Sequence, residues 1–314
     1  MTIEACPDLF EGLFEDDAMA IMRYKQELAE LKRCVVTKSS STGAKQLSIP
    51  HTLARSAVFA GVELRAKHDA MVTRRMRDVP GAGSFSIRYR GPILSQDHFD
   101  VLMVLYLLLK EKGADENGFL ETSFYQISKY AGLTKGGQTN RLLERILEDL
   151  NSGIFVISFH VGEEGDRLEY KGPLLYEQGL ELTENGKSGR LRIRLNPRLN
   201  KAMFNAGWSW NDVDIRRALG RNSLAKWLYT FISSSDTLVE MKVRKLVALS
   251  GNEHLEYKAF RRKLRKAVER LNEVIGWELQ VDKEFLRGSP LITVEEYINM
   301  RSAQQHQGGD FASA

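Results

Sequence analysis

The apolar and polar positions of the chain repeat with two periods, and the first clear strand and helix lie next to each other. Residues 85–90 alternate apolar and polar side chains, which predicts a half-buried strand that ends at Gly91 and Pro92. Ser95 is a suitable N-cap for the helix that follows. Because residues 101–109 are apolar on every side, we expect this helix to be buried at the centre of a domain.

A helix-turn-helix pattern comes next. Residues 123–132 predict a short helix closed by a glycine, residues 133–136 a turn, and residues 137–151 a second helix with leucines on one face. Three runs of strand-like residues, joined by polar, glycine-containing turns, then predict a β-wing behind the second helix. These runs are residues 154–161, 167–182 and 190–196. Helix, helix-turn-helix and β-ribbon is the order of a winged-helix domain.

The same order recurs loosely in the last third of the chain. We expect a helical pair over residues 214–233, a short helix over residues 243–251 and a long helix over residues 255–275. A hairpin built from residues 277–282 and 290–294 follows. The predicted fold is therefore α+β, with two tandem winged-helix domains and an N-terminal extension.

These elements divide the chain into four predicted parts. Residues 1–45 form the extension, with a helix over residues 15–34 followed by a polar, flexible linker. The first winged-helix domain spans residues 46–206 and the second spans residues 207–300. The polar tail, residues 301–314, is predicted to be disordered. A length of 314 residues suits two globular domains.

Composition narrows the class of protein. Apolar residues make up 43% of the chain and charged residues 27%, which excludes a mostly disordered protein. The longest apolar run, residues 101–109, has about half the length that a bilayer-spanning helix needs. The acidic N-terminus does not resemble a secretory signal, so we expect a cytoplasmic protein. With only Cys6 and Cys34, neither a disulfide framework nor a four-cysteine zinc site is possible.

The long helix near the C-terminus separates apolar from basic residues. Phe260, Leu264 and Leu271 fall on one face when the helix turns about 100° per residue. The basic residues lie on the other face and its flanks, and they are Lys258, Arg261, Arg262, Lys263, Arg265 and Lys266. Such a face can enter the major groove, where Arg and Lys reach phosphates and guanine acceptors.

The alternative interpretation of this helix is an ordinary solvated face. The net charge of the chain is only +4, which does not establish a nucleic-acid partner. Glu269 also lies in the middle of the basic face, so only the N-terminal half is predicted to meet bases. The position of the helix, second in a helix-turn-helix and followed by a hairpin, favours DNA binding.

The corresponding helix of the first domain has a weaker pattern. Its candidate DNA-binding residues are Lys135, Gln138, Arg141 and Arg145. Glu144, Glu148 and Asp149 offset these charges, which favours contact with the DNA backbone or packing in a dimer over base reading.

Motifs for catalysis are missing from the sequence. Residues 186–188 resemble the end of a P-loop, but Glu181 stands where the first glycine is required. The six histidines lack metal-binding spacing, and no GxSxG motif or Cys–His pair is present. We therefore predict a non-enzymatic protein without metal or cofactor. The tryptophans, predicted to be core and hinge anchors, are Trp208, Trp210, Trp227 and Trp277.

Several stretches together resemble the TrfA-type plasmid replication initiators, and they occur in the expected order over about residues 46–290. They are QLSIPHTLARSAVFAGVE, FSIRYRGPILSQDHFDVLMVLYLLL, LRIRLNPRLNKAMF, RRALGRNSLAKWLYTFISSSD and AFRRKLRKAVERL. The resemblance implies binding to direct repeats, the iterons, in a plasmid origin, opening of an AT-rich segment and recruitment of host replication proteins. It also implies that the second domain reads iterons while the first contacts the DNA backbone and forms inactive dimers, which control plasmid copy number.

A short segment resembles the peptide that docks into the replicative sliding clamp. The matching residues are Gln46, Leu47, Ser48 and Ile49. Pro50 replaces the aromatic residue that ends such peptides. The alternative is that Leu47 and Ile49 simply begin the first domain.

Two other functions stay open at this point. A winged-helix transcriptional repressor that binds an operator as a dimer would share the same physics, and the two are distinguished by the target, direct repeats or one inverted repeat. An origin-nicking enzyme would need a metal site and a nucleophilic tyrosine, and the sequence does not assemble them.

Overall fold

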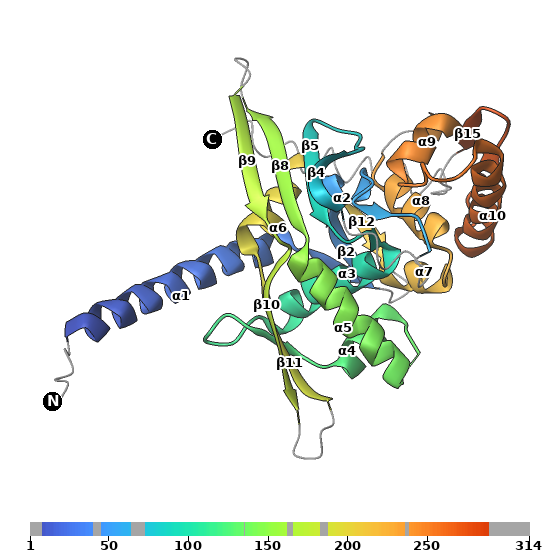
Figure 1. The fold of residues 1–314 in the computed structure, drawn as a ribbon. Coiled ribbons are helices and arrows are strands. Elements are labelled where there is room, and N and C mark those ends of the chain that lie inside the picture. The colour runs from blue at the N-terminus through green and yellow to red at the C-terminus, as the bar shows by residue number, and fades with distance from the viewer. Residues whose placement is uncertain are drawn as a thin grey trace, which may run out of the picture.

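The computed structural model describes residues 8–39, 45–63, 73–134, 136–161, 166–182, 188–235 and 239–288. Within these ranges the chain is a mixed α+β protein with two clusters of buried apolar side chains (Figure 1). The first cluster runs from Leu28 to Phe204 and the second from Leu219 to Leu286. The predicted domain boundary lies between residues 206 and 207, and residues 208–212 beyond it pair with residues 46–50.

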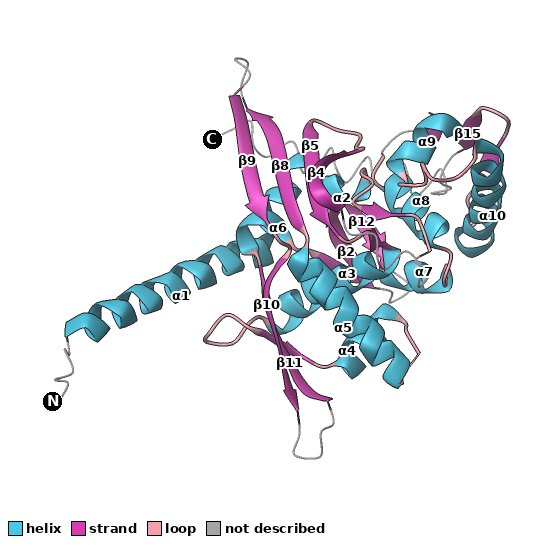
Figure 2. Cartoon of the chain, viewed as in Figure 1, coloured by secondary structure: helices cyan, strands magenta, loops and turns pink. Residues whose placement is uncertain are grey.

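Helices and strands are interspersed along the described chain (Figure 2). The helices are α1 (Asp8–Cys34), α2 (His51–Ala54), α3 (Gln96–Lys112), α4 (Phe124–Ala131), α5 (Gly137–Ser152), α6 (Pro197–Met203), the 3-10 helix η1 (Phe204–Ala206), α7 (Val213–Ala218), α8 (Ser223–Ser233), α9 (Val243–Leu249) and α10 (Tyr257–Ile275). Among the described residues, no helix combines the length and the apolar character that crossing a bilayer requires.

The strands of the described residues form five small sheets. They are β1 (Thr37–Ser39), β2 (Lys45–Pro50), β3 (Phe59–Ala60), β4 (Thr73–Val79), β5 (Phe85–Gly91), β6 (Leu94–Ser95), β7 (Leu120–Thr122), β8 (Ile154–Val161), β9 (Asp166–Gly172), β10 (Leu175–Leu182), β11 (Ser188–Leu195), β12 (Trp208–Asp212), β13 (Val239–Lys242), β14 (Gln280–Val281) and β15 (Phe285–Gly288). The strand orders are β1-β2-β12, β10-β11-β7, β13-β15-β14, β3-β6 and β4-β5-β8-β9.

Helix α3 is the centre of the first cluster, as its uniformly apolar sequence predicts. Every residue from Val101 to Leu109 is buried. Ser95 caps this helix as expected, and the cap is reciprocal, because His98 Nδ1 accepts a hydrogen bond from the Ser95 backbone N–H at 3.1 Å. Since Nδ1 is an acceptor, Nε2 carries the proton and donates to Asp149 Oδ2 at 3.0 Å. This ring therefore ties the start of α3 to the end of α5.

Replacing His98 with alanine is expected to lower the free energy of unfolding by about 1–3 kcal/mol, because it leaves the buried Ser95 amide without an acceptor. His160 is exposed on β8 and provides the control, since His160→Ala removes the same ring from the surface. Urea denaturation followed by circular dichroism measures both variants. Equal stability of the two variants would contradict the assigned role of His98.

The predicted wing of the first domain needs correction, because only part of it lies where the sequence places it. β8 and β9 join β4 and β5, in a sheet where Ile87 faces Ile157 and Tyr89 faces Phe155. Only β10 and β11 form a hairpin beside α5, and β11 pairs on its other edge with β7. Alternation of apolar residues predicts which face of a strand is buried but not which strand pairs with it. The pattern therefore did not show that β8–β9 and β10–β11 belong to different sheets.

One order of elements and one strand pairing occur twice in the described chain. The first copy is α3, β7, α4, α5, β10 and β11, with β8 and β9 inserted between α5 and β10 and with β11 between β7 and β10 in the sheet. The second copy is α8, β13, α9, α10, β14 and β15, with β15 between β13 and β14. Within the described residues, β14 therefore pairs with residues 285–288. Residues 290–294 and the tail 301–314 lie outside the described residues.

The N-terminal segment is attached to the first cluster. Leu28 and Leu31 on α1 and Val35 after it are buried among the residues of that cluster. β1 then pairs with β2, so residues 35–39 are not the flexible linker that their polar composition predicts. Residues 40–44 lie outside the described residues. Figure 1 shows the first turns of α1 projecting away from the rest of the chain.

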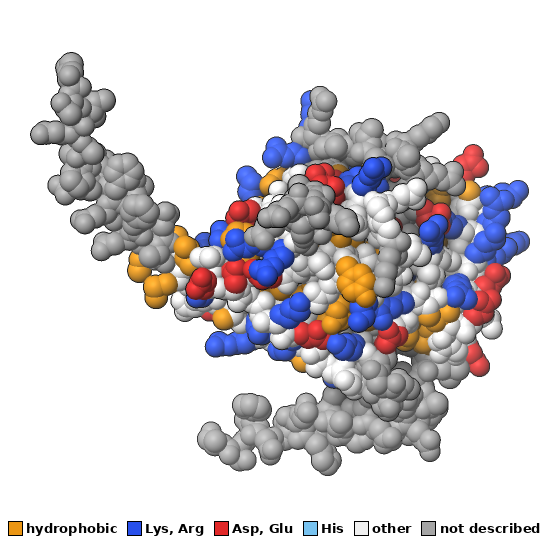
Figure 3. Space-filling model, turned by 90° about the horizontal axis from the view of Figure 1, so that it is seen from below, with side chains coloured by type: hydrophobic (Ala, Val, Ile, Leu, Met, Phe, Trp, Pro, Cys, Tyr) orange, Lys and Arg blue, Asp and Glu red, His pale blue; other side chains and the backbone are white. Residues whose placement is uncertain are grey.

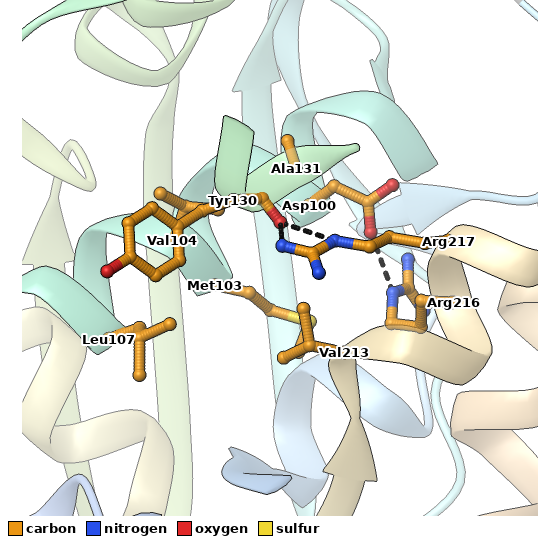
Figure 4. Close-up of a pocket in the computed structure, with 9 residues that line it drawn as sticks. All are labelled: Asp100, Met103, Val104, Leu107, Tyr130, Ala131, Val213, Arg216 and Arg217. Atoms are coloured by element: carbon orange, nitrogen blue, oxygen red, sulfur yellow. Dashed lines mark hydrogen bonds and ion pairs between the residues drawn. The ribbon is translucent and has the colours of Figure 1, made fainter. Parts of the chain in front are cut away.

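A buried polar network joins α3 to α7 and α8, and so connects the two clusters. The Asp100 carboxylate accepts hydrogen bonds from Arg216 Nε at 2.7 Å and from Lys226 Nζ at 2.6 Å. Arg216 also donates to Gln96 Oε1 at 2.9 Å and to Thr230 Oγ1 at 2.6 Å. Figure 4 shows Asp100 and Arg216 pointing toward each other at a pocket between α3, α4 and α7.

Candidate nucleic-acid interface

Helix α10 presents opposite faces to the core and to solvent, which confirms the predicted separation. Phe260, Leu264 and Leu271 are fully buried in the second cluster. Lys258, Arg262, Arg265 and Lys266 are exposed, and Arg261 and Lys263 are half-buried at the flanks. In Figure 3, Lys and Arg side chains gather at the edge of the molecule where α10 lies, with acidic side chains beside them. The helix ends at Gly276, whose φ of +77° suits glycine.

The basic side chains in the two halves of α10 differ in whether they have partners within the protein. Within the described residues, the four exposed basic side chains of its first half form no ion pair. In the second half, Arg270 pairs with Glu273 at 3.1 Å and donates to the Ala218 carbonyl at 2.6 Å. Glu269, which follows these basic residues toward the C-terminal end of the helix, is exposed. This distribution favours the N-terminal half of α10 as the part that meets an anionic partner.

Basic residues on the neighbouring elements extend this surface, and the sequence pattern did not single them out. Lys242, Arg244 and Lys245 are exposed at the start of α9, and Lys283 is exposed in the turn between β14 and β15. The only sequence signal is that Lys242, Arg244 and Lys245 lie close together in the chain. Their placement beside α10 is a consequence of the tertiary fold.

Asp282 shapes the turn that carries Lys283. Its carboxylate accepts hydrogen bonds from the backbone N–H groups of Phe285 and Glu284, both at 2.7 Å, and pairs with Arg287 at 2.6 Å. These amides, together with the Arg287 charge, lower the pKa of the Asp282 carboxyl from its ordinary value. The turn therefore keeps an ionised aspartate at neutral pH.

Three of the four DNA-binding candidates of the predicted first domain lie together on α5. Gln138, Arg141 and Arg145 are exposed on this helix, with Glu144 and Glu148 exposed among them. Lys135 lies outside the described residues. Asp149, whose negative charge was expected to offset these basic residues, is half-buried and hydrogen-bonded to His98.

The segment predicted to bind a sliding clamp is part of the fold, which contradicts that prediction for the folded chain. Gln46, Leu47, Ser48 and Ile49 lie in β2, the middle strand of its sheet, between β1 and β12. The side chains of Leu47 and Ile49 have no exposed surface. A docking peptide must present its side chains and backbone to a partner. In β2 the apolar side chains are buried, and the backbone pairs with β1 and β12. The alternative, that these residues begin the first domain, fits the structure.

Two of the four tryptophans are core anchors as predicted, and the other two, Trp208 and Trp210, lie outside the buried clusters. Trp227 and Trp277 are buried in the second cluster. Trp208 keeps 40% of its surface exposed on β12 and packs edge-on against Trp210, with ring centroids 5.0 Å apart.

Ser95, His98 and Asp149 form a Ser–His–Asp series of contacts. Ser95 Oγ lies 3.1 Å from His98 Nδ1, but Ser95 and His98 are both about 98–99% buried within a helix cap. The hydroxyl has no route to a substrate, so the geometry is that of a cap. No group of three or more His, Cys, Asp or Glu side chains in the described ranges is arranged to hold a metal ion.

No protein-family model and no curated protein matches the chain. Its fold is similar to a crystal structure of selenomethionine derivatives of domains 2 and 3 of RctB, with a TM-score of 0.51, 13% sequence identity, and coverage of 76% of this chain and 98% of that one. A second crystal structure of RctB domains 2–3 gives a TM-score of 0.47 at 12% identity, with coverage of 79% and 99%. At this identity the likeness to the first structure concerns the fold alone.

Proposed function

We propose that this chain is a replication initiator that binds double-stranded DNA, and that the N-terminal half of α10 reads the sequence. The observation that carries the proposal is the exposed row of Lys258, Arg262, Arg265 and Lys266, which have no acidic partner in the described part of the chain. The fold shared with RctB domains 2 and 3 supports it, because RctB is a replication initiator.

Each of the two repeated units is proposed to be a winged-helix domain. Each unit contains three helices and a three-stranded sheet. In each sheet the strand that comes last in the chain lies between the other two and pairs with both. In this assignment α4–α5 and α9–α10 are the helix-turn-helix pairs, and the hairpins β10–β11 and β14–β15 are the wings. The mixed charge of α5 suits contact with the DNA backbone and self-association.

The finer proposal follows the TrfA-type resemblance of the sequence. The targets are iterons in a plasmid origin, and copies bound side by side open a neighbouring AT-rich segment and recruit the host initiator and helicase. The protein acts in the cytoplasm by binding and without catalysis. Opening DNA without ATP requires that the binding energy and negative supercoiling offset a few kcal/mol of unstacking per distorted step.

Footprinting of the purified protein across the replication region of its plasmid tests this proposal. We expect protection of phased direct repeats, together with permanganate-reactive thymines in an adjacent AT-rich stretch of a supercoiled template. Repeating the footprint at two salt concentrations measures how many phosphates are engaged. Protection of one promoter palindrome without melting would instead favour a transcriptional repressor, and absence of any protection would contradict DNA recognition.

A further inference from the structure

Tyr257, the first residue of α10, contacts three elements of the second domain. The Arg244 guanidinium of α9 lies 5.1 Å from the centroid of its ring, and the Arg261 guanidinium of α10 lies 6.0 Å from it. The Tyr257 hydroxyl donates a hydrogen bond to the Lys283 carbonyl, at 3.0 Å, in the turn between β14 and β15. One aromatic side chain thus holds α9, α10 and the hairpin turn together.

The surface beside this tyrosine is basic. Lys242, Arg244 and Lys245 are exposed within one turn of chain, and none of them forms an ion pair within the described ranges. Helix α9 itself contains no acidic residue. The three side chains therefore place positive charge next to the exposed row of α10.

The acids nearest to this surface in the sheet are already paired. Arg287 on β15 contacts Glu240 at 3.4 Å and Asp282 at 2.6 Å. One arginine engages both carboxylates, so it balances one of their two negative charges and a net charge of −1 remains beside the basic residues of α9. Three further acids are exposed near this surface, Glu284 in the hairpin turn and Glu253 and Glu256 just before α10, and the basic residues that face them are Lys242, Arg244, Lys245 and Lys283.

We propose that α9 is a second DNA contact, separate from α10, in which Arg244 binds a backbone phosphate and Tyr257 positions it. Lys242 and Lys245 bind neighbouring phosphates. Phosphate is the expected ligand because, in a helix-turn-helix, the helix before the recognition helix crosses the DNA backbone and does not enter the groove. Stacking on an aromatic ring restrains the guanidinium, so less freedom is lost when the phosphate binds. This inference rests on the proposed function.

Phosphate contacts are independent of sequence, so a fluorescein-labelled duplex of about 40 base pairs and mixed sequence is a suitable probe. Fluorescence anisotropy with the full chain, between about 50 and 200 mM salt, gives the affinity and its salt dependence. We expect Arg244→Gln to lower the slope of log K against log salt by about 1 and to weaken binding by roughly 3- to 10-fold.

The positioning role of Tyr257 is tested with separate variants. Tyr257→Leu removes the ring and is expected to lower the salt slope as Arg244→Gln does, whereas Tyr257→Phe keeps the ring and the slope. If Tyr257 acts through Arg244, then Tyr257→Leu changes the slope little in a chain that already carries Arg244→Gln. A merely structural tyrosine would lower the melting temperature of the Leu variant and leave its slope at the parent value, which would overturn the positioning role.

The matched control is Lys25→Gln, which removes one exposed positive charge from α1 and should leave the slope unchanged. An equal slope for Arg244→Gln and the parent would refute the α9 contact. If the parent binds and the double variant Arg262→Ala, Arg265→Ala weakens binding while Arg244→Gln does not, only this inference fails. If the parent binds no duplex at all, the proposed function fails with it.

Discussion

Replacing Asp100 with asparagine is expected to lower the free energy of unfolding by about 3–5 kcal/mol. The side chains of Asp100, Arg216 and Lys226 are only 12%, 3% and 8% exposed. Removal of the carboxylate charge leaves two buried cations next to each other without a counter-charge. An uncompensated buried charge lowers the free energy of unfolding by far more than an exposed ion pair raises it, because water cannot solvate the buried charge.

Urea denaturation followed by tryptophan fluorescence measures this loss, since Trp227 and Trp277 lie in the second cluster, where Arg216 and Lys226 are anchored. The control is Asp214→Asn, which breaks the Arg217–Asp214 pair of 2.7 Å while the aspartate side chain is 52% exposed. An exposed pair contributes about 0–1 kcal/mol, so this control should unfold almost as the parent does. A loss below about 1 kcal/mol in Asp100→Asn would contradict the role of the network.

Alanine at both Arg262 and Arg265 is expected to abolish sequence-specific DNA binding. Each arginine that is bidentate to guanine contributes about 1–3 kcal/mol, and its loss relaxes specificity at one base position. Both side chains are exposed on the face of α10 that opposes the core, so their removal should leave the fold intact. Binding isotherms on the protected repeats and on base-substituted repeats separate affinity from specificity.

Arg270→Ala is the matched control on the same helix, because Arg270 is engaged by Glu273 and the Ala218 carbonyl. It should retain specific binding. A purely phosphate-binding role for Arg262 and Arg265 would weaken all sequences equally and lower the salt slope by about 1 for each residue. Equal affinity of the double variant and the parent for the repeats would refute the assignment of α10 as the recognition helix.

Local periodicity was enough to predict the elements on which the candidate site rests. The 3.6-residue repeat of Phe260, Leu264 and Leu271 predicts both the buried face of α10 and the exposed face opposite to it, since all of these positions lie on one helix. The Ser95 cap and the buried centre of α3 were predictable for the same reason. Short-range geometry determines each of these features.

Strand partners were not predictable from the same patterns. The alternation in residues 154–161 predicts a strand, but β5, about 70 residues earlier, is its partner and not the wing. The QLSI segment has the pattern of a docking peptide, and β12, some 160 residues later, covers one of its edges. A short motif carries no information on which distant strand will pair with it.

The amphipathic faces of the helices and the basic row on α10 follow from the sequence alone, because they depend on residues three or four apart. Tertiary structure alone decided that Asp100 meets Arg216 and Lys226, more than 110 residues away, and that Tyr257 lies between Arg244 and the Lys283 carbonyl. In the sequence, these charges look like ordinary solvated side chains. Their roles arise from desolvation and proximity, which exist only once the distant elements pack against each other.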